Sequence, residues 1–205
     1  MRKGAVILAA GAGMRLGGVA KALLNAGGGR TFLSQILATA REVGLQRAIV
    51  VVGPPFGEQV AAHAVDLGAE VVINPQPERG MASSVALGFA AIAGTAPNME
   101  GQEVTAGPGV DAAWLWPVDH PDVTAATLRE LERQLGTHAA TRPTVGGRGG
   151  HPPLITRGLW PQLAACGDAP QGARSVLVES DMLDVEVTDE GCVRDVDTQF
   201  DLEKV

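Results

Sequence analysis

Short aliphatic runs alternate with longer segments of helical period through the first two thirds of the chain, and this alternation strongly constrains the fold. The aliphatic runs predict buried strands at residues 5–10, 48–52, 69–73 and 112–116. Apolar residues at helical spacing predict helices at residues 31–43, 57–67, 81–92 and 125–135. Strand–helix–strand units with short connections form right-handed crossovers onto a parallel sheet. We therefore expect an α/β fold with a mostly parallel central sheet.

The pattern changes after Thr141. Short apolar segments at 154–156 and 183–187, together with glycines at 146–150 that lie between apolar pieces, predict additional strands, antiparallel ones among them. Residues 94–109 are polar, contain Gly and Pro and follow neither period, so we expect a flexible surface loop, as a tolerated insertion or a lid. A length of 205 residues favours one domain, residues 1–205.

Composition narrows the class of partner. Aromatic residues make up 3% of the chain, so the core must come from Val, Leu, Ile and Ala, which suits a buried parallel sheet. The net charge of −7 argues against a nucleic-acid or anionic-membrane surface, although a local cluster of Arg and Lys can still bind a small phosphorylated ligand.

The chain starts with basic residues and an apolar run, but Arg15 and Lys21 interrupt the run early, which argues against a secretion signal. The spacing of Cys166 and Cys192 suggests neither a disulfide framework nor a zinc site. We expect a soluble cytoplasmic protein with reduced thiols.

A glycine-rich loop, GAGMRLG at residues 11–17, directly follows the first expected strand. Glycine allows positive φ and close approach of a ligand, and successive N–H groups in such a loop bind anions. Arg15 and Lys21 would add charge-assisted hydrogen bonds to phosphate oxygens. The spacing fits neither a dinucleotide fingerprint, whose third glycine would come one residue earlier, nor a Walker loop, since alanines flank Lys21. A glycine-rich turn with two solvated cations is the alternative.

The residues of this loop resemble a family signature. LAAGAGMRLGGVAK, residues 8–21, is similar to the L-A-A-G-x-G-x-R-x-G…K stretch of MobA-like nucleotidyltransferases, especially the molybdenum cofactor cytidylyltransferase branch. Leu16 and Ala20 replace the usual Met and Pro, and neither change removes a charge. The resemblance implies a Rossmann-like three-layer α/β/α fold whose loop wraps a nucleoside triphosphate. The residues implied to bind it are Leu8, Ala9, Ala10, Gly11, Gly13, Arg15 and Lys21.

Four later stretches resemble the same family in order, so the resemblance covers residues 5–202 with 94–109 unmatched. They are Asn74 with GMASSV (80–85), WPVDHP (116–121), GHPPL (150–154) and DVDTQFDL (195–202). Hydroxyls at a helix start suit an anion, although a helix cap is the alternative for the serines. The resemblance adds four nucleotide-binding residues, Asn74, Gly80, Ser83 and Ser84. It also implies that residues after about 140 face the acceptor, where Arg174 would meet a phosphate.

The resemblance implies a metal site as well. Mg²⁺ prefers one or two carboxylates together with phosphate oxygens and water. By the resemblance, Asp119 is the metal ligand and Asp197 is the second carboxylate. An Asx turn is the alternative for Asp119. His120 stands at a variable family position, and Asp201 is expected to cap the last helix. The implied catalytic residues are Arg15, Lys21 and Asp119.

The implied reaction is transfer of a nucleoside monophosphate to a phosphorylated acceptor, with release of pyrophosphate. The quartet Leu8–Gly11, LAAG, favours CTP, because LAGG goes with guanylyl transfer in this family. Molybdopterin is the first implied acceptor, with a molybdoenzyme as a further partner. The alternatives are a sugar- or alditol-phosphate nucleotidyltransferase and a non-catalytic nucleotide-binding cofactor-maturation protein. An NAD-binding protein is disfavoured, because Gly53 and two prolines replace the acidic residue expected after the second strand.

Overall fold

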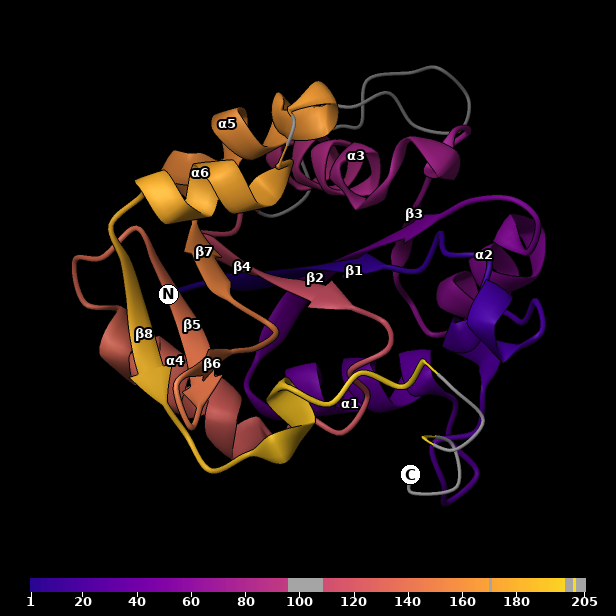
Figure 1. The fold of residues 1–205 in the computed structure, drawn as a ribbon, viewed down its shortest axis with the longest axis horizontal. Coiled ribbons are helices and arrows are strands. Elements are labelled where there is room, and N and C mark those ends of the chain that lie inside the picture. The colour runs from indigo at the N-terminus through magenta and orange to yellow at the C-terminus, as the bar shows by residue number, and fades with distance from the viewer. Residues whose placement is uncertain (96–108, 170, 198–200, 202–205) are drawn as a thin grey trace.

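The computed structural model describes residues 1–95, 109–169, 171–197 and 201 (Figure 1). Its centre is an eight-stranded sheet in the order β3-β2-β1-β4-β7-β5-β6, with β8 paired to β5. The strands are β1 Lys3–Leu8, β2 Leu45–Val52, β3 Glu70–Ile73, β4 Ala112–Pro117, β5 Ala140–Val145, β6 Arg148–Gly149, β7 Leu154–Thr156 and β8 Met182–Glu186. The α-helices are α1 Phe32–Glu42, α2 Gly57–Asp66, α3 Met81–Ala93, α4 Ala125–Leu135, α5 Trp160–Ala164 and α6 Ala173–Glu179.

The first half of the sheet confirms the expected parallel arrangement. β1 lies between β2 and β4, and β3 pairs with β2, all in parallel. β1 ends at Leu8, two residues earlier than predicted, although Ala9 N–H still donates to Val51 O at 2.8 Å. β2 begins at Leu45, three residues before the predicted start.

The second half is mixed, as expected. β7 is antiparallel to both β4 and β5, and β8 is parallel to β5. Since β7 joins β4 to β5, the two halves form one continuous sheet.

Helices cover both faces of this sheet. Figure 1 shows α3, α5 and α6 on one side, with α1 and α4 on the other. Strand residues alternate between the two faces: Ile7 packs in the core with α1, α2 and α4, whereas Val6 and Leu8 pack in the core with α3 and α5. The resulting three layers confirm the expected fold class.

Helix starts follow local sequence signals. Thr31 forms a capping box with Ser34 at the start of α1, and the Thr124 hydroxyl accepts from Thr127 N at the start of α4. Among the described residues, no helix is long and apolar enough to cross a membrane. The predicted flexible loop at 94–109 lies, apart from its ends, outside the described residues.

Candidate active site

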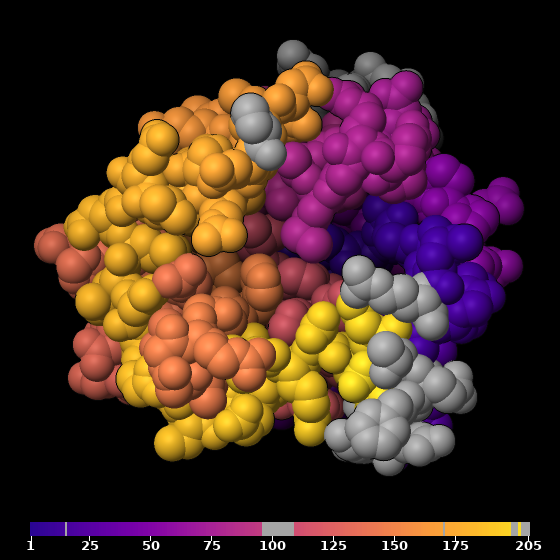
Figure 2. Space-filling model, in the orientation of Figure 1, coloured from indigo at the N-terminus to yellow at the C-terminus, as the bar shows by residue number. Residues whose placement is uncertain are grey.

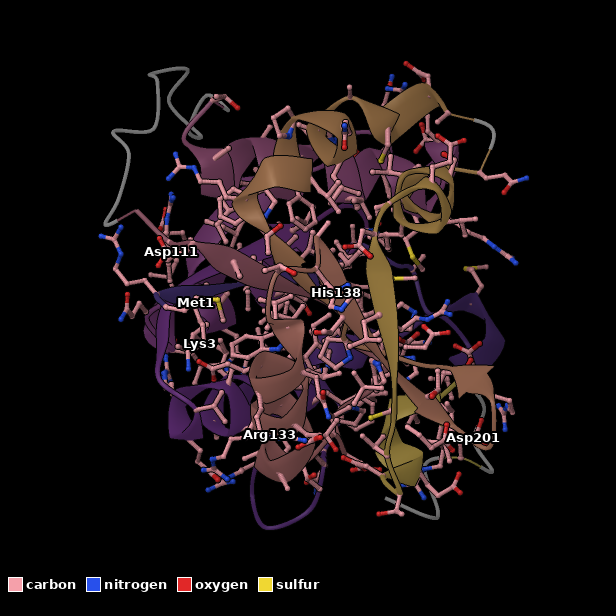
Figure 3. All side chains as sticks on the ribbon, turned by 90° about the vertical axis from the view of Figure 1, so that its left-hand side faces the viewer. Met1, Lys3, Asp111, Arg133, His138 and Asp201 are labelled. Atoms are coloured by element: carbon pink, nitrogen blue, oxygen red, sulfur yellow. The ribbon has the colours of Figure 1, made fainter. Side chains whose placement is uncertain are left out.

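The glycine loop and Asp119 leave the sheet from neighbouring strands at one edge. Leu8 ends β1 directly opposite Pro117, which ends β4, and Val118 N–H donates to Leu8 O at 3.1 Å. Figure 3 shows the same polarity from the side, with Asp111, just before β4, at the opposite end of the molecule from Asp201. Ligands of open α/β sheets bind beyond these carboxyl ends.

Gly13 shapes this loop, because a side chain at its position would clash with the backbone of Val19. Gly13 has φ 57°, and a Cβ built on it would lie 2.2 Å from Val19 O. Its carbonyl accepts from Leu16 N at 2.9 Å and from Gly18 N at 3.0 Å, so the loop closes on itself around a short 3₁₀ turn, Met14–Leu16. Arg15 lies on this turn, and the position of its side chain is outside what the structure describes.

Three charged side chains converge opposite this loop. The ammonium of Lys21, on the 3₁₀ turn Lys21–Leu23, donates to Asp119 Oδ2 at 2.9 Å and also to Asp197 Oδ1. The exposed fractions are 14% for the lysine side chain and 24% and 22% for the two aspartates. The structure thus brings Lys21 next to two aspartates that follow it in the chain by 98 and 176 positions.

The cluster favours a charged lysine. Burial opposes protonation of Lys21, but the hydrogen bonds and negative charges of Asp197 and Asp119 outweigh it, so the pKa of Lys21 is raised above its usual value. At neutral pH Lys21 therefore carries its positive charge.

A pocket of about 370 Å³ contains this cluster. Figure 2 shows the face hollowed between the indigo N-terminal region, the magenta α3 region and the yellow C-terminal segment. Met14, on the glycine loop, and Met81, at the start of α3, also line it and are 78% and 61% exposed. Of the predicted nucleotide-binding residues, the lining includes Leu8, Ala10, Gly11, Gly13, Lys21, Gly80 and Ser84.

Asn74, Ser83 and Ala9 lie away from this lining, and Asn74 has a structural role that the sequence did not indicate. Its Nδ2 donates to both Ser83 Oγ and Ser84 Oγ at 2.9 Å, and its Oδ1 accepts from Gln76 N at 3.0 Å. Asn74 is 1% exposed, and Ala9 belongs to the core on the α1 side. Asn74 therefore holds the start of α3 against the end of β3.

Two histidines lie beside the cluster on the side of the second half-sheet. The rings of His120 and His151 are 5.1 Å apart, and His120 Nδ1 lies 3.2 Å from Gly191 O. Burial, together with His120, lowers the pKa of His151 to about 4. His151 is therefore a neutral ring at physiological pH. Its proximity to His120 arises from packing that no local motif predicts.

Three further expectations concern the second half. Arg174 lies on α6, as part of the short helix after Gly172. Asp201 Oδ2 accepts from Asp197 N at 3.3 Å, and the residues after Asp201 that it was expected to cap lie outside the described ranges. Cys166 and Cys192 are both buried free thiols.

Two sequence relatives place the chain among known proteins. Nicotine blue oxidoreductase from Paenarthrobacter nicotinovorans is 30% identical over 205 residues, covering 94% of this chain and 91% of that protein. A bifunctional IPC transferase and DIPP synthase from Thermococcus kodakarensis is 37% identical over 94 residues. That match covers 44% of this chain and 21% of the longer relative, so the chain spans about a fifth of that protein's length.

Among solved structures, Rv0371c from Mycobacterium tuberculosis H37Rv is similar over 100% of this chain and 96% of its own, with a TM-score of 0.75 and 27% identity. Rv0371c has also been solved in complex with manganese; that structure has a TM-score of 0.68 and 22% identity, over 100% and 97% of the two chains. The MobA-like NTP transferase domain matches residues 5–184. With a glycine loop, a lysine and two carboxylates gathered at the edge of a parallel sheet, the chain belongs to the MobA-like NTP transferase family and is a nucleotidyltransferase.

Proposed function

We propose that the protein transfers CMP from CTP to a phosphorylated acceptor, molybdopterin in the first place, in a Mg²⁺-dependent reaction that releases pyrophosphate. The observation that carries this proposal is the convergence of Lys21, Asp119 and Asp197 opposite the glycine loop in one pocket. The LAAG quartet supports CTP. Met14 and Met81 offer soft, polarizable surfaces to a planar base or pterin ring.

An oxygen of the acceptor phosphate attacks the α-phosphorus, the bond to the bridging oxygen of the β-phosphate breaks, and its electron pair leaves with pyrophosphate. Catalysis of such a transfer is mostly alignment and charge stabilisation. The glycine loop donates backbone N–H groups to the phosphates, and Lys21 and Arg15 balance the charge of the leaving pyrophosphate. The domain arrangement follows: the first half binds the nucleotide, and residues after about 140 face the acceptor.

The two carboxylates fit a hard divalent cation. They are partly exposed, lie in the pocket and already share one cationic partner, and Mg²⁺ takes one or two carboxylates with phosphate oxygens completing its shell. When bound there, the ion would neutralise charge near the α-phosphate.

Pyrophosphate release tests the proposal. The purified protein is assayed with Mg²⁺ and each of CTP, GTP, ATP and UTP, with and without molybdopterin. Release that requires both CTP and molybdopterin is the expected result. Tight CTP binding without release would favour the non-catalytic nucleotide-binding alternative, and release with a sugar or alditol phosphate would replace the acceptor.

The relative named nicotine blue oxidoreductase, with its 30% identity over most of this chain, supplies a second candidate, oxidation–reduction of a heterocyclic compound. The same preparation is assayed for NADH and NADPH consumption with a heterocyclic dye as acceptor. We expect none, because the glycine spacing of residues 11–17 does not fit a dinucleotide site. Consumption that depends on the dye would favour the oxidoreductase.

A further inference from the structure

Asp197 reaches the pocket on irregular chain, not at the end of a strand. Residues 189–197, called the strap below, follow β8 and consist of one 3₁₀ turn, Glu190–Cys192, and chain without regular secondary structure. The strap nevertheless brings the Asp197 carboxylate to the same ammonium group as Asp119. Something other than sheet register must therefore set its position.

The strap is anchored at its start by one carboxylate. Asp189 Oδ2 accepts from Thr124 N and Thr124 Oγ1, both at 2.8 Å, and from Thr127 Oγ1 at 2.7 Å. Asp189 Oδ1 accepts from Gly191 N at 3.1 Å. Thr124 is the N-cap of α4 and Thr127 lies in its first turn, where a negative charge is also favoured by the helix dipole.

Further contacts continue along the strap towards the pocket. His151 N–H donates to Cys192 O at 2.8 Å, Arg194 pairs with Asp122, and Val196 N–H donates to Asp119 O at 2.9 Å. The last contact joins the strap to the backbone of the other carboxylate residue.

The fit is close at one glycine of the strap. A Cβ on Gly191 would lie 2.7 Å from Asp122 O, so the backbone passes directly against the loop that follows β4. The strap is therefore packed tightly against the loop that also carries Asp119.

We propose that Asp189 is a positioning residue for the cation site: by fixing the strap to α4, it holds Asp197 opposite Asp119. This inference rests on the proposed function, because it takes Asp119 and Asp197 as the metal-binding pair. Residues that orient metal ligands typically change metal affinity by about 10- to 100-fold when removed. We expect Asp189→Ala to weaken divalent-cation binding by about tenfold while the protein remains folded.

The test measures Mn²⁺ binding to the full chain by isothermal titration calorimetry and electron paramagnetic resonance, well below the unfolding temperature of every variant. The variants are Asp189→Ala, Asp197→Ala and the double variant. Since Asp189 acts through Asp197, its removal should have no further effect once Asp197 is absent, which a double-mutant cycle measures directly.

Two matched variants separate anchoring from charge and folding. Thr127→Val removes one anchor bond without changing charge and should weaken Mn²⁺ binding less than Asp189→Ala does. Asp184→Ala removes an exposed carboxylate on β8 that pairs with Arg142, and it should leave Mn²⁺ binding unchanged. If Asp189→Ala proves too unstable, Thr127→Val carries the test.

The outcomes distinguish the two proposals. Asp197-dependent Mn²⁺ binding that is unchanged in both Asp189→Ala and Thr127→Val overturns the positioning role and leaves the proposed function intact. Mn²⁺ binding that does not depend on Asp197 overturns the metal assignment in the proposed function, and the positioning role with it. Equal weakening by Asp189→Ala and Asp184→Ala would reduce the effect to general charge and also overturn the role.

Discussion

Asp119 and Asp197 reach the same ammonium group from two differently built regions. Asp119 stands two residues beyond β4, whose six residues are all buried and in continuous register with β1. Asp197 stands at the end of the strap, which is held to α4 and to the loop after β4 by a few individual contacts. One carboxylate is placed by a sheet and the other by anchors.

This difference predicts where the site is vulnerable. A residue at the end of a buried strand is positioned by many backbone hydrogen bonds acting together, so no single distant side chain moves it. Each anchor of the strap contributes about 0.5–1.5 kcal/mol, or more where a charge takes part. Substitutions outside the pocket should therefore disturb the site mainly through the strap.

The largest expected effect concerns the two carboxylates themselves. Although their supports differ, Asp119→Asn and Asp197→Asn should each lower kcat for pyrophosphate release by about 100- to 1,000-fold, because each removes a carboxylate that would hold the divalent cation against the reacting phosphates. Asp181→Asn, an exposed carboxylate beside His138, is the control and should retain full turnover. Turnover within tenfold of wild type for either pocket variant would contradict the prediction that the two carboxylates contribute equally to catalysis.

The free energy of unfolding should depend on pH through His151, whose backbone N–H donates to Cys192 O of the strap. His151 has a pKa of about 4 in the folded protein, against an ordinary 6.5, because burial and His120 disfavour its charged form. The unfolded chain therefore binds more protons between pH 6.5 and 4, and stability falls as the pH drops through that window. The loss approaches about 3 kcal/mol at the acid end. Urea unfolding of wild type and His151→Gln at pH 7 and 4.5 should show a smaller loss in the variant; equal losses would refute this assignment.

A smaller effect should sharpen the description of the glycine loop. Gly13 and Gly28 have the same φ of 57°, so alanine at either position is strained by about 1–2 kcal/mol. Only at Gly13 would the new Cβ also meet a backbone oxygen; at Gly28 nothing lies within 4 Å. We expect Gly13→Ala to lower the free energy of unfolding by about 2 kcal/mol more than Gly28→Ala. Equal losses in denaturant unfolding would mean that the loop relaxes around the extra atom.

The smallest predicted effect concerns the charge between the carboxylates. Because a lysine ammonium beside a cation site repels the cation, Lys21→Met should strengthen Mn²⁺ binding without nucleotide by about tenfold. It should also weaken CTP binding. Lys3→Met, which removes a lysine at the start of β1 that pairs with Glu132 on α4, is the control for loss of charge. Weaker Mn²⁺ binding in Lys21→Met would show that the lysine organises the carboxylates instead of competing for them.

Local patterns predicted much of the first half. The periods of residues 31–43 and 125–135 indicated α1 and α4 to within a residue, and the aliphatic runs indicated β1 to β4. The glycine loop is recognisable because the preceding strand, the glycines and the two basic residues follow one another closely in the sequence. Here each signal depends on a few neighbouring residues, so the chain order carries it.

Other features depend on residues far apart. The family resemblance indicated Asp197, but only the folded chain shows that Asp197 contacts Lys21 and that Asp189 anchors its segment. The folded chain also shows that His120 packs beside His151 and that Asn74 binds the serines at the start of α3. Periodicity tells which face of a strand or helix is apolar. It does not tell which loop an irregular segment such as 189–197 lies against, because that choice is set by side-chain hydrogen bonds and close backbone contacts between segments that are far apart in the sequence.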